Sequence, residues 1–240
     1  MNQTEFEIKC LLGTQANADA FIIKLEEFGV DTKISVTPER QLNHYFSGGN
    51  VLDIYNKVSS QMPMKDAEAL YHICIHSHNH SVRTRSILPW DQTILVIKSS
   101  NNENSSHNGV TRLEFEYPFP EMTLQELDLV LLDLGWEYLS KWSRIRTRYR
   151  INDIAICLDQ NAGYGYIAEF ETILAPQEDT ITAESRIRTL MMQLGVHELD
   201  QTKLEAMFDH YNQNRSDYYG SSRTFDMSAN DDIIHYEFDK

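Results

Sequence analysis

The sequence predicts an α+β fold, a closed antiparallel β-barrel with helices packed on the outside. Several short segments alternate charged and apolar residues, as in EFEIK at residues 5–9, and a period of two is typical of a β-strand. Their charged faces are almost purely Glu, Arg and Lys, whereas a solvent face usually mixes in Ser, Thr, Gln and Asn. Segments with apolar residues at helical spacing lie between these strands. Closure into a barrel accounts for the charged faces, because alternate side chains then point into the interior.

The first strand places Glu5, Glu7 and Lys9 on one face and Phe6 and Ile8 on the other. Taken alone, it is an ordinary half-buried strand whose charged face lies in water. The pattern recurs, however, in strands expected near residues 81–88, 93–100, 110–119, 136–151, 153–159 and 165–174. Their charged positions are Arg83, Arg85, Lys98, Arg112, Glu114, Glu116, Arg144, Arg146, Arg148, Asp159, Glu169 and Glu171. This recurrence favours one charged interior shared by all these strands over several separate solvent-exposed faces.

Helices are expected, from apolar residues that recur every three or four positions, near residues 16–28, 123–134, 182–194 and 200–213. Gly29 is expected to end the first helix, and Thr123 to cap the second. A shorter helical pattern begins near Val51 and is expected to end at Pro63, because proline interrupts the helical hydrogen bonds.

The segment ALYHICIHSHNH, residues 69–80, alternates in a way that predicts another strand. On a strand, one face would carry His72, Cys74, His76, His78 and His80. Such a row contains soft ligands for Zn²⁺ or Ni²⁺, but a flat row does not converge on one tetrahedral ion. We therefore expect a hairpin with solvated histidines, with selection of the substrate as an untested alternative.

Composition limits the classes of protein to which the chain can belong. With 240 residues and 41% hydrophobic content it can form one large β-rich domain or two small ones. Its three cysteines form no CxxC pair, so neither a disulfide framework nor a zinc knuckle is indicated. A formal charge of -15 argues against duplex nucleic acid or an anionic membrane as a partner. No secretory signal or membrane-spanning stretch is recognisable, so a cytoplasmic location is expected.

The charged strand faces themselves suggest a ligand. Several arginines and lysines in a confined space require an anionic partner, and the planar guanidinium binds phosphate oxygens through two hydrogen bonds. Carboxylates in the same space would repel phosphates unless a cation lay between them. Glu and Asp oxygens suit hard cations such as Mg²⁺ or Mn²⁺. The predicted ligand is therefore a metal-bound polyphosphate.

These residues resemble the motifs of the CYTH superfamily, the triphosphate tunnel metalloenzymes, which include class IV adenylate cyclases, thiamine triphosphatases and inorganic triphosphatases. EFEIK is similar to the family's E-x-E-x-K signature. The other matching elements, in chain order, are Q-x-x-x-Y-F (Gln41, Tyr45, Phe46), R-x-R (Arg83, Arg85), the strand-ending Lys98, R-x-E-x-E (Arg112, Glu114, Glu116), R-x-R-x-x-Y (Arg144, Arg146, Tyr149), L-D (Leu158, Asp159) and G-Y-x-x-E-x-E (Gly165, Tyr166, Glu169, Glu171). The first motif alone is weak, but the ordered set is specific.

The resemblance implies roles for these residues. The principal metal would be held by Glu5, Glu7 and Glu171, with Glu169 and Asp159 beside it or on a second ion. The triphosphate would be bound by Lys9, Arg83, Arg85, Lys98, Arg144, Arg146 and Lys203. Arg112 would be a further substrate contact, and Glu114 and Glu116 further metal ligands or charge partners. Glu5, Glu7, Lys9 and Asp159 are the expected catalytic residues.

The chain also departs from the family's usual pattern. Ser47 follows Tyr-Phe where members usually have Asp, and Asp217-Tyr218-Tyr219 only loosely matches the C-terminal motif. Residues 48–80 are expected to be an insertion within a tunnel domain spanning 1–225. Residues 226–240 are expected to be an acidic, flexible tail.

The motifs leave the reaction open. The favoured function is metal-dependent hydrolysis of the terminal phosphate of tripolyphosphate, thiamine triphosphate or ATP, because hydrolysis needs no base-recognition pocket. The alternative within the same site is a class IV adenylate cyclase that converts ATP to cyclic AMP and pyrophosphate. Rivals of other classes are a non-catalytic polyphosphate or nucleotide sensor and an all-β carrier with wet strand faces.

Overall fold

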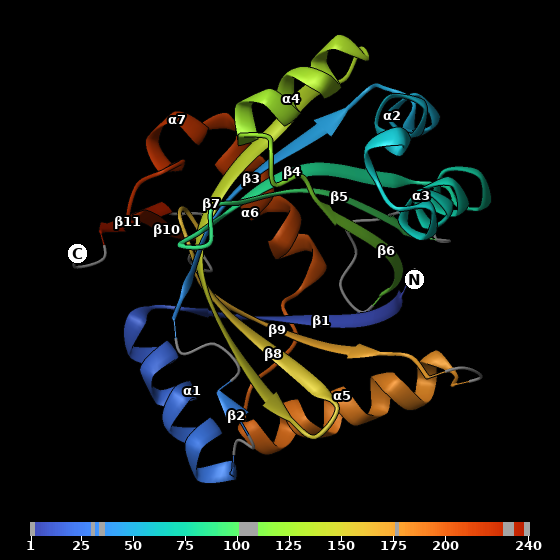
Figure 1. Cartoon of the computed structure of the whole chain (residues 1–240). Coiled ribbons are helices and arrows are strands. Elements are labelled where there is room, and N and C mark those ends of the chain that lie inside the picture. The colour runs from blue at the N-terminus through green and yellow to red at the C-terminus, as the bar shows by residue number, and fades with distance from the viewer. Residues whose placement is uncertain are drawn as a thin grey trace. The chain divides into compact units, whose positions relative to one another are not determined.

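The computed structural model describes residues 3–29, 32–33, 37–100, 110–175, 178–227 and 233–237 (Figure 1). Its strands are β1 (Gln3–Gly13), β2 (Thr32–Lys33), β3 (Glu39–Ser47), β4 (His80–Leu88), β5 (Gln92–Ser100), β6 (Val110–Pro118), β7 (Glu137–Ile151), β8 (Ile154–Asn161), β9 (Gly165–Ile173), β10 (Arg223–Met227) and β11 (Ile233–Glu237). Its helices are α1 (Gln15–Phe28), α2 (Val51–Val58), the 3-10 turn η1 (Ser59–Gln61), α3 (Met64–His76), α4 (Leu124–Asp133), α5 (Thr180–Leu194), α6 (Gln201–Gln213) and α7 (Arg215–Tyr218).

The main sheet has the strand order β2-β7-β3-β4-β5-β6-β1-β9-β8. Because β7 also pairs with β8, the eight strands from β7 to β8 in this order form a closed ring, and β2 pairs with β7 outside it. The predicted fold class, an α+β fold built on a closed antiparallel β-barrel, is thereby confirmed. A second, two-stranded sheet is formed by β10 and β11. None of the helices in the described ranges is long and apolar enough to cross a membrane.

The chain divides into two compact units, one formed by residues 1–5 and 41–141 and the other by residues 6–40 and 142–240. In the first unit, β4, β5 and β6 supply apolar residues such as Val82, Leu95 and Phe115 to a core shared with α2, α3 and α4. The strands are antiparallel, with Val82 opposite Ile97 and Ile97 opposite Phe115. One face of this sheet therefore packs on helices, and alternation sends the charged residues to the other face.

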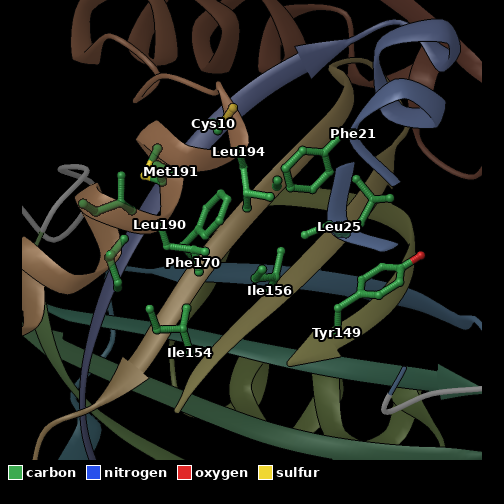
Figure 2. Packing of buried hydrophobic residues seen from close by; sticks show 14 of the residues in the cluster. Cys10, Phe21, Leu25, Tyr149, Ile154, Ile156, Phe170, Leu190, Met191 and Leu194 are labelled. Atoms are coloured by element: carbon green, nitrogen blue, oxygen red, sulfur yellow. The ribbon is translucent and has the colours of Figure 1, made fainter. Parts of the chain in front are cut away.

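In the second unit, helices α1 and α5 cover the apolar faces of β1, β8 and β9 (Figure 2). Phe21 of α1 meets Phe170 of β9 edge to face, with ring centroids 6.1 Å apart. Leu190 and Leu194 of α5 are buried in the same cluster. The expected stop at Gly29 is confirmed, because this glycine caps α1 in the left-handed conformation with a φ of 85°.

The strand expected at residues 69–80 is wrong, because most of this segment belongs to helix α3. Its buried residues, Leu70 and Ile73, are three positions apart, which is a helical spacing. The His and Cys residues alternate in the sequence as they would on a strand, but alternate residues of a helix do not share one face. His72 and His76 instead lie one turn apart with ring centroids separated by 4.6 Å, while the Cys74 thiol donates to the carbonyl of Val51.

One helix boundary differs from expectation, and part of the predicted C-terminal tail forms a strand. Helix α2 ends at Val58, five residues before Pro63, and Pro63 instead begins α3 as its N-cap, where its fixed φ and missing N–H are tolerated. Near the C-terminus, β11 pairs with β10 within the segment expected to be a flexible tail. The rest of that tail, residues 228–232 and 238–240, lies outside the described residues.

Candidate functional site

Six charged side chains of the first unit form a group, which we call the first charged cluster. Its members are Glu5 of β1, Arg83 and Arg85 of β4, Lys98 of β5, and Glu114 and Glu116 of β6. The register of β5 and β6 places Lys98 directly opposite Glu114. The Nζ atom of Lys98 lies 3.1 Å from Glu114 Oε2 and 3.5 Å from Glu5 Oε2. Two carboxylates therefore share one ammonium group.

The arginines of this cluster are oriented by neutral partners on β3. Nη1 of Arg83 donates to the hydroxyl of Tyr45 at 2.9 Å, and Nε of Arg85 donates to Oδ1 of Asn43 at 2.8 Å. Nη1 of Arg85 also lies 2.9 Å from Glu116 Oε1. The Arg85 side chain is only 5% exposed, whereas that of Glu116 is 40% exposed, so this pair extends from the interior to solvent.

The carboxyl group of Glu114 is ionised at neutral pH. Burial opposes its charge, but Lys98, a hydrogen bond with Glu5 and the charges of Arg83 and Arg85 outweigh burial and lower the pKa of Glu114 to about 2. With three acids and three bases, the first charged cluster is formally balanced in charge. It can bind an added anion only if a cation compensates the carboxylates.

Six side chains of the second unit form the second charged cluster. Its members are Glu7 and Lys9 of β1, Arg144 and Arg146 of β7, Asp159 of β8 and Glu169 of β9. Arg146 lies opposite Asp159 in the register and binds it with two hydrogen bonds, from Nε and Nη2, of 2.6 Å each. Nη1 of Arg144 lies 2.7 Å from the same carboxylate. Asp159, whose side chain is 1% exposed, thus receives two guanidinium groups.

Glu169 connects these arginines to Lys9. It accepts from Nη2 of Arg146 and lies 3.8 Å from Nη1 of Arg144 and 3.9 Å from Nζ of Lys9. Lys9 also pairs with Glu7. Burial disfavours ionisation of Glu169, yet Arg146, Lys9 and Arg144 outweigh it and Glu7, so its pKa lies well below its usual value. Here again two carboxylates share one ammonium group.

The side chain of Cys157 forms a further set of contacts in the second unit. Cys157 precedes Asp159 by two residues on β8 and lies fully buried between Nη1 of Arg148, at 3.7 Å, and Oε2 of Glu171, at 3.8 Å. Burial raises the pKa of this thiol well above its ordinary value, so it is neutral. Arg148 in turn binds both carboxylate oxygens of Glu39.

The remaining predicted residues are less closely associated. Lys203 lies in the first turn of α6, where its backbone N–H donates to Asp200, and its ammonium forms no ion pair with another described residue. Arg112 is buried on β6, opposite Ser100 in the register. In the part of the chain that the structure describes, no three His, Cys, Asp or Glu side chains are gathered as a ready metal site.

Sequence reasoning named Tyr45 of strand β3 only as part of a family motif and gave this strand no role in orienting the arginines. Glu39, Asn43 and Tyr45 orient Arg148, Arg85 and Arg83, respectively. The signal was present, because these residues occupy odd positions of a strand whose even positions include apolar Leu42 and Phe46. It was overlooked because the polar partners on this strand are mostly neutral amide and hydroxyl groups.

Comparisons with known proteins agree with this architecture. Residues 73–203 match the model of the CYTH domain family. Among solved structures, a conserved hypothetical protein of Pyrococcus furiosus has a TM-score of 0.59 at 18% identity, and a protein of Pyrococcus horikoshii has a TM-score of 0.60 at 16% identity; each alignment covers 84% of this chain and 98% of the other. A Vibrio parahaemolyticus protein provisionally named an adenylate cyclase has a TM-score of 0.56 at 13% identity, covering 86% of this chain and 99% of its own. No curated protein matches the sequence.

The family match spans strands β4 to β9, which carry nine of the twelve members of the two charged clusters. The other three, Glu5, Glu7 and Lys9, lie on β1. The matched segment is more than half of the chain. The chain therefore belongs to the CYTH domain family.

Proposed function

We propose that the chain is a metal-dependent triphosphatase that releases the terminal phosphate of an inorganic or organic triphosphate. Members of the CYTH family are triphosphatases or adenylate cyclases. The observation that carries the proposal is the composition of the two charged clusters. Each combines buried guanidinium groups with two carboxylates around one ammonium, as in the group formed by Lys98, Glu5 and Glu114.

The guanidinium and ammonium groups would bind the phosphate oxygens. In the second charged cluster, Arg144 and Arg146 offer planar donor sets that suit phosphate oxygens. During transfer, negative charge builds up on the oxygen that joins the terminal phosphate to the rest of the substrate. Positive groups that are already in place stabilise this charge without having to reorganise. Arg83, Arg85, Lys9 and Lys98 are assigned the same role, and Arg112 and Lys203 are further substrate contacts.

The carboxylates fit a hard divalent cation. Lys98 between Glu5 and Glu114, and Lys9 beside Glu7 and Glu169, mark positions where two carboxylates already hold one positive charge. Mg²⁺ or Mn²⁺ would supply further positive charge at the phosphate oxygens. We assign its binding to Glu5, Glu7 and Glu171, with Asp159, Glu169, Glu114 and Glu116 as additional ligands or charge partners. A carboxylate of this set, Asp159 or Glu7, would orient the attacking water and accept its proton.

The test is a product analysis. The full chain is incubated with tripolyphosphate, thiamine triphosphate or ATP, each with Mg²⁺ or Mn²⁺, and phosphate, pyrophosphate and cyclic AMP are separated and quantified. The proposal expects orthophosphate together with the corresponding diphosphate, only in the presence of the metal. Cyclic AMP with pyrophosphate would replace hydrolysis by the cyclase alternative, to which the provisional name of the Vibrio protein also points.

A pair of matched variants separates catalysis from simple binding. Glu7→Gln removes one buried carboxylate charge without changing its size, and it should lower kcat/KM by about 100-fold, typical of the loss of one charged active-site group. Glu121→Gln makes the same change at an exposed position and should leave activity intact. A non-catalytic sensor would bind triphosphate in wild type and in Glu7→Gln but release no product from either.

A further inference from the structure

A buried polar network lies on the helix-covered side of the first unit, away from the charged residues. Its centre is Asp128 of α4, which is 2% exposed. This carboxylate accepts from Nδ1 of His44 at 2.6 Å, from the hydroxyl of Tyr138 at 2.7 Å and from the hydroxyl of Thr84. Burial opposes the charge of Asp128, but its three donors outweigh burial and lower its pKa. The carboxylate is therefore a satisfied acceptor joined to three strands.

The positions of these donors relate the network to the first charged cluster. His44 lies between Asn43 and Tyr45 on β3, and Thr84 lies between Arg83 and Arg85 on β4. Since side chains alternate along a strand, His44 and Thr84 point towards α4 while their neighbours point to the opposite face. On that opposite face, Arg83 binds Tyr45 and Arg85 binds Asn43.

Strands β3 and β4 are therefore linked by side-chain hydrogen bonds on both faces. The two arginine bonds join β3 to β4 on the charged face, and Asp128 bridges His44 and Thr84 on the other. A shift of β3 along β4 would break the bridge and would separate each arginine from its partner. Register is specified strongly where both faces of a strand pair make such directed contacts.

We propose that Asp128, His44 and Thr84 are positioning residues that hold Arg83 and Arg85 ready for the triphosphate. The guanidinium groups touch the substrate, whereas these three residues act through the strands that carry them. Preorganisation of this kind lowers the entropy lost when the anion binds. The role is inferred from the hydrogen bonds of this chain to Asp128, one of which comes from His44, outside the segment that matches the family model. The effect on affinity rests on the proposed function, whereas the effect on the arginines does not.

The experiment compares three variants with wild type. Thr84→Val keeps the shape of the buried side chain and removes its hydrogen bond to Asp128. Thr84→Ser keeps the hydroxyl and should therefore behave like wild type. Thr93→Val is the matched control, because it makes the same change at a buried threonine of the neighbouring strand β5. Thr93 is not one of the three residues that donate hydrogen bonds to Asp128. Circular dichroism and thermal unfolding confirm that each variant is folded.

The first measurement does not depend on activity. The Nε–H signal of Arg85, assigned in a ¹⁵N spectrum by its loss in Arg85→Lys, reports the bond to Asn43 through its exchange with water. Thr84→Val should accelerate this exchange by about ten-fold, as expected for the loss of one hydrogen bond, while Thr84→Ser and Thr93→Val stay within about two-fold of wild type. If exchange in Thr84→Val stays within about two-fold of wild type, the proposal is overturned.

The second measurement is tripolyphosphate binding and turnover with Mg²⁺. Thr84→Val should raise Kd and KM by about ten-fold with a smaller change in kcat, and Thr84→Ser should restore them. Unchanged Kd and KM beside accelerated exchange would overturn the link from the network to substrate binding. If the wild type neither binds nor hydrolyses a triphosphate, the proposed function fails, and the exchange measurement still decides whether the network positions the arginines.

Discussion

Glu114 should make the stability of the protein depend on pH in a way that Glu114→Gln removes. Its pKa is about 2 in the folded protein against an ordinary value of 4.5. A depressed folded-state pKa contributes stability that is present above pH 4.5 and lost as the pH falls towards 2. The full contribution is about 3 kcal/mol, since each pKa unit corresponds to about 1.4 kcal/mol. Between pH 6 and pH 3, about 2 kcal/mol of this should be lost.

Urea unfolding at pH 6 and pH 3 measures this quantity. Other carboxylates also titrate in this range, so the informative value is the free energy of unfolding of wild type minus that of Glu114→Gln. This difference should shrink by about 2 kcal/mol at the lower pH. Glu121→Gln, an exposed control, should stay within about 0.5 kcal/mol of wild type at both values. A difference for Glu114→Gln that does not change with pH would refute the conclusion that Lys98 and the arginines hold this carboxylate ionised.

Three other outcomes are expected. Asp159→Asn should lower the free energy of unfolding, measured in urea, by about 3 kcal/mol, because it leaves two guanidinium groups facing a neutral amide. Asp209→Asn, at an exposed position, should change this free energy by less than about 0.5 kcal/mol. Equal effects of the two substitutions would contradict the burial of the Asp159 ion pair. Gly49→Ala should cost about 1–3 kcal/mol and alter tryptophan fluorescence, because a Cβ atom would lie 2.3 Å from the ring of Trp136. The three cysteines, whose thiol pKa values are all raised by burial, should resist a thiol reagent at pH 8 until urea is added; labelling of native Cys157 would contradict its buried position.

The strands were predictable because their two faces differ so sharply in chemistry. Arg83 and Arg85, for example, share one face of β4, whereas Val82 and Thr84 lie buried on the other face. The error at residues 69–80 has a physical cause. Alternation of His and Cys carries little information, since neither residue type strongly prefers a helix or a strand, whereas the spacing of Leu70 and Ile73 decides the matter in favour of the helix.

The charged site was predictable to the level of residue type and strand face, but its partners were not. Charge alternation identified Arg85 and Glu116, whereas the partner Asn43 is neutral and lies 42 residues away along the chain. Asp128 was hidden in another way. Its helix shows a regular apolar stripe, and only tertiary packing reveals that this one acid lies on the buried side with three donors around it.

The ion pairs within each charged cluster have a thermodynamic consequence for ligands of opposite sign. Arg146 and Lys98 each pair with a carboxylate of their own cluster, so under the proposed function a polyphosphate that took either base would leave that carboxylate without its partner. A divalent cation that bound the carboxylates would replace the arginine or lysine there and would free that base for the anion. The two ligands of the proposed function would then be linked heterotropically, and the factor by which magnesium tightened binding of the anion would equal the factor by which the anion tightened binding of magnesium.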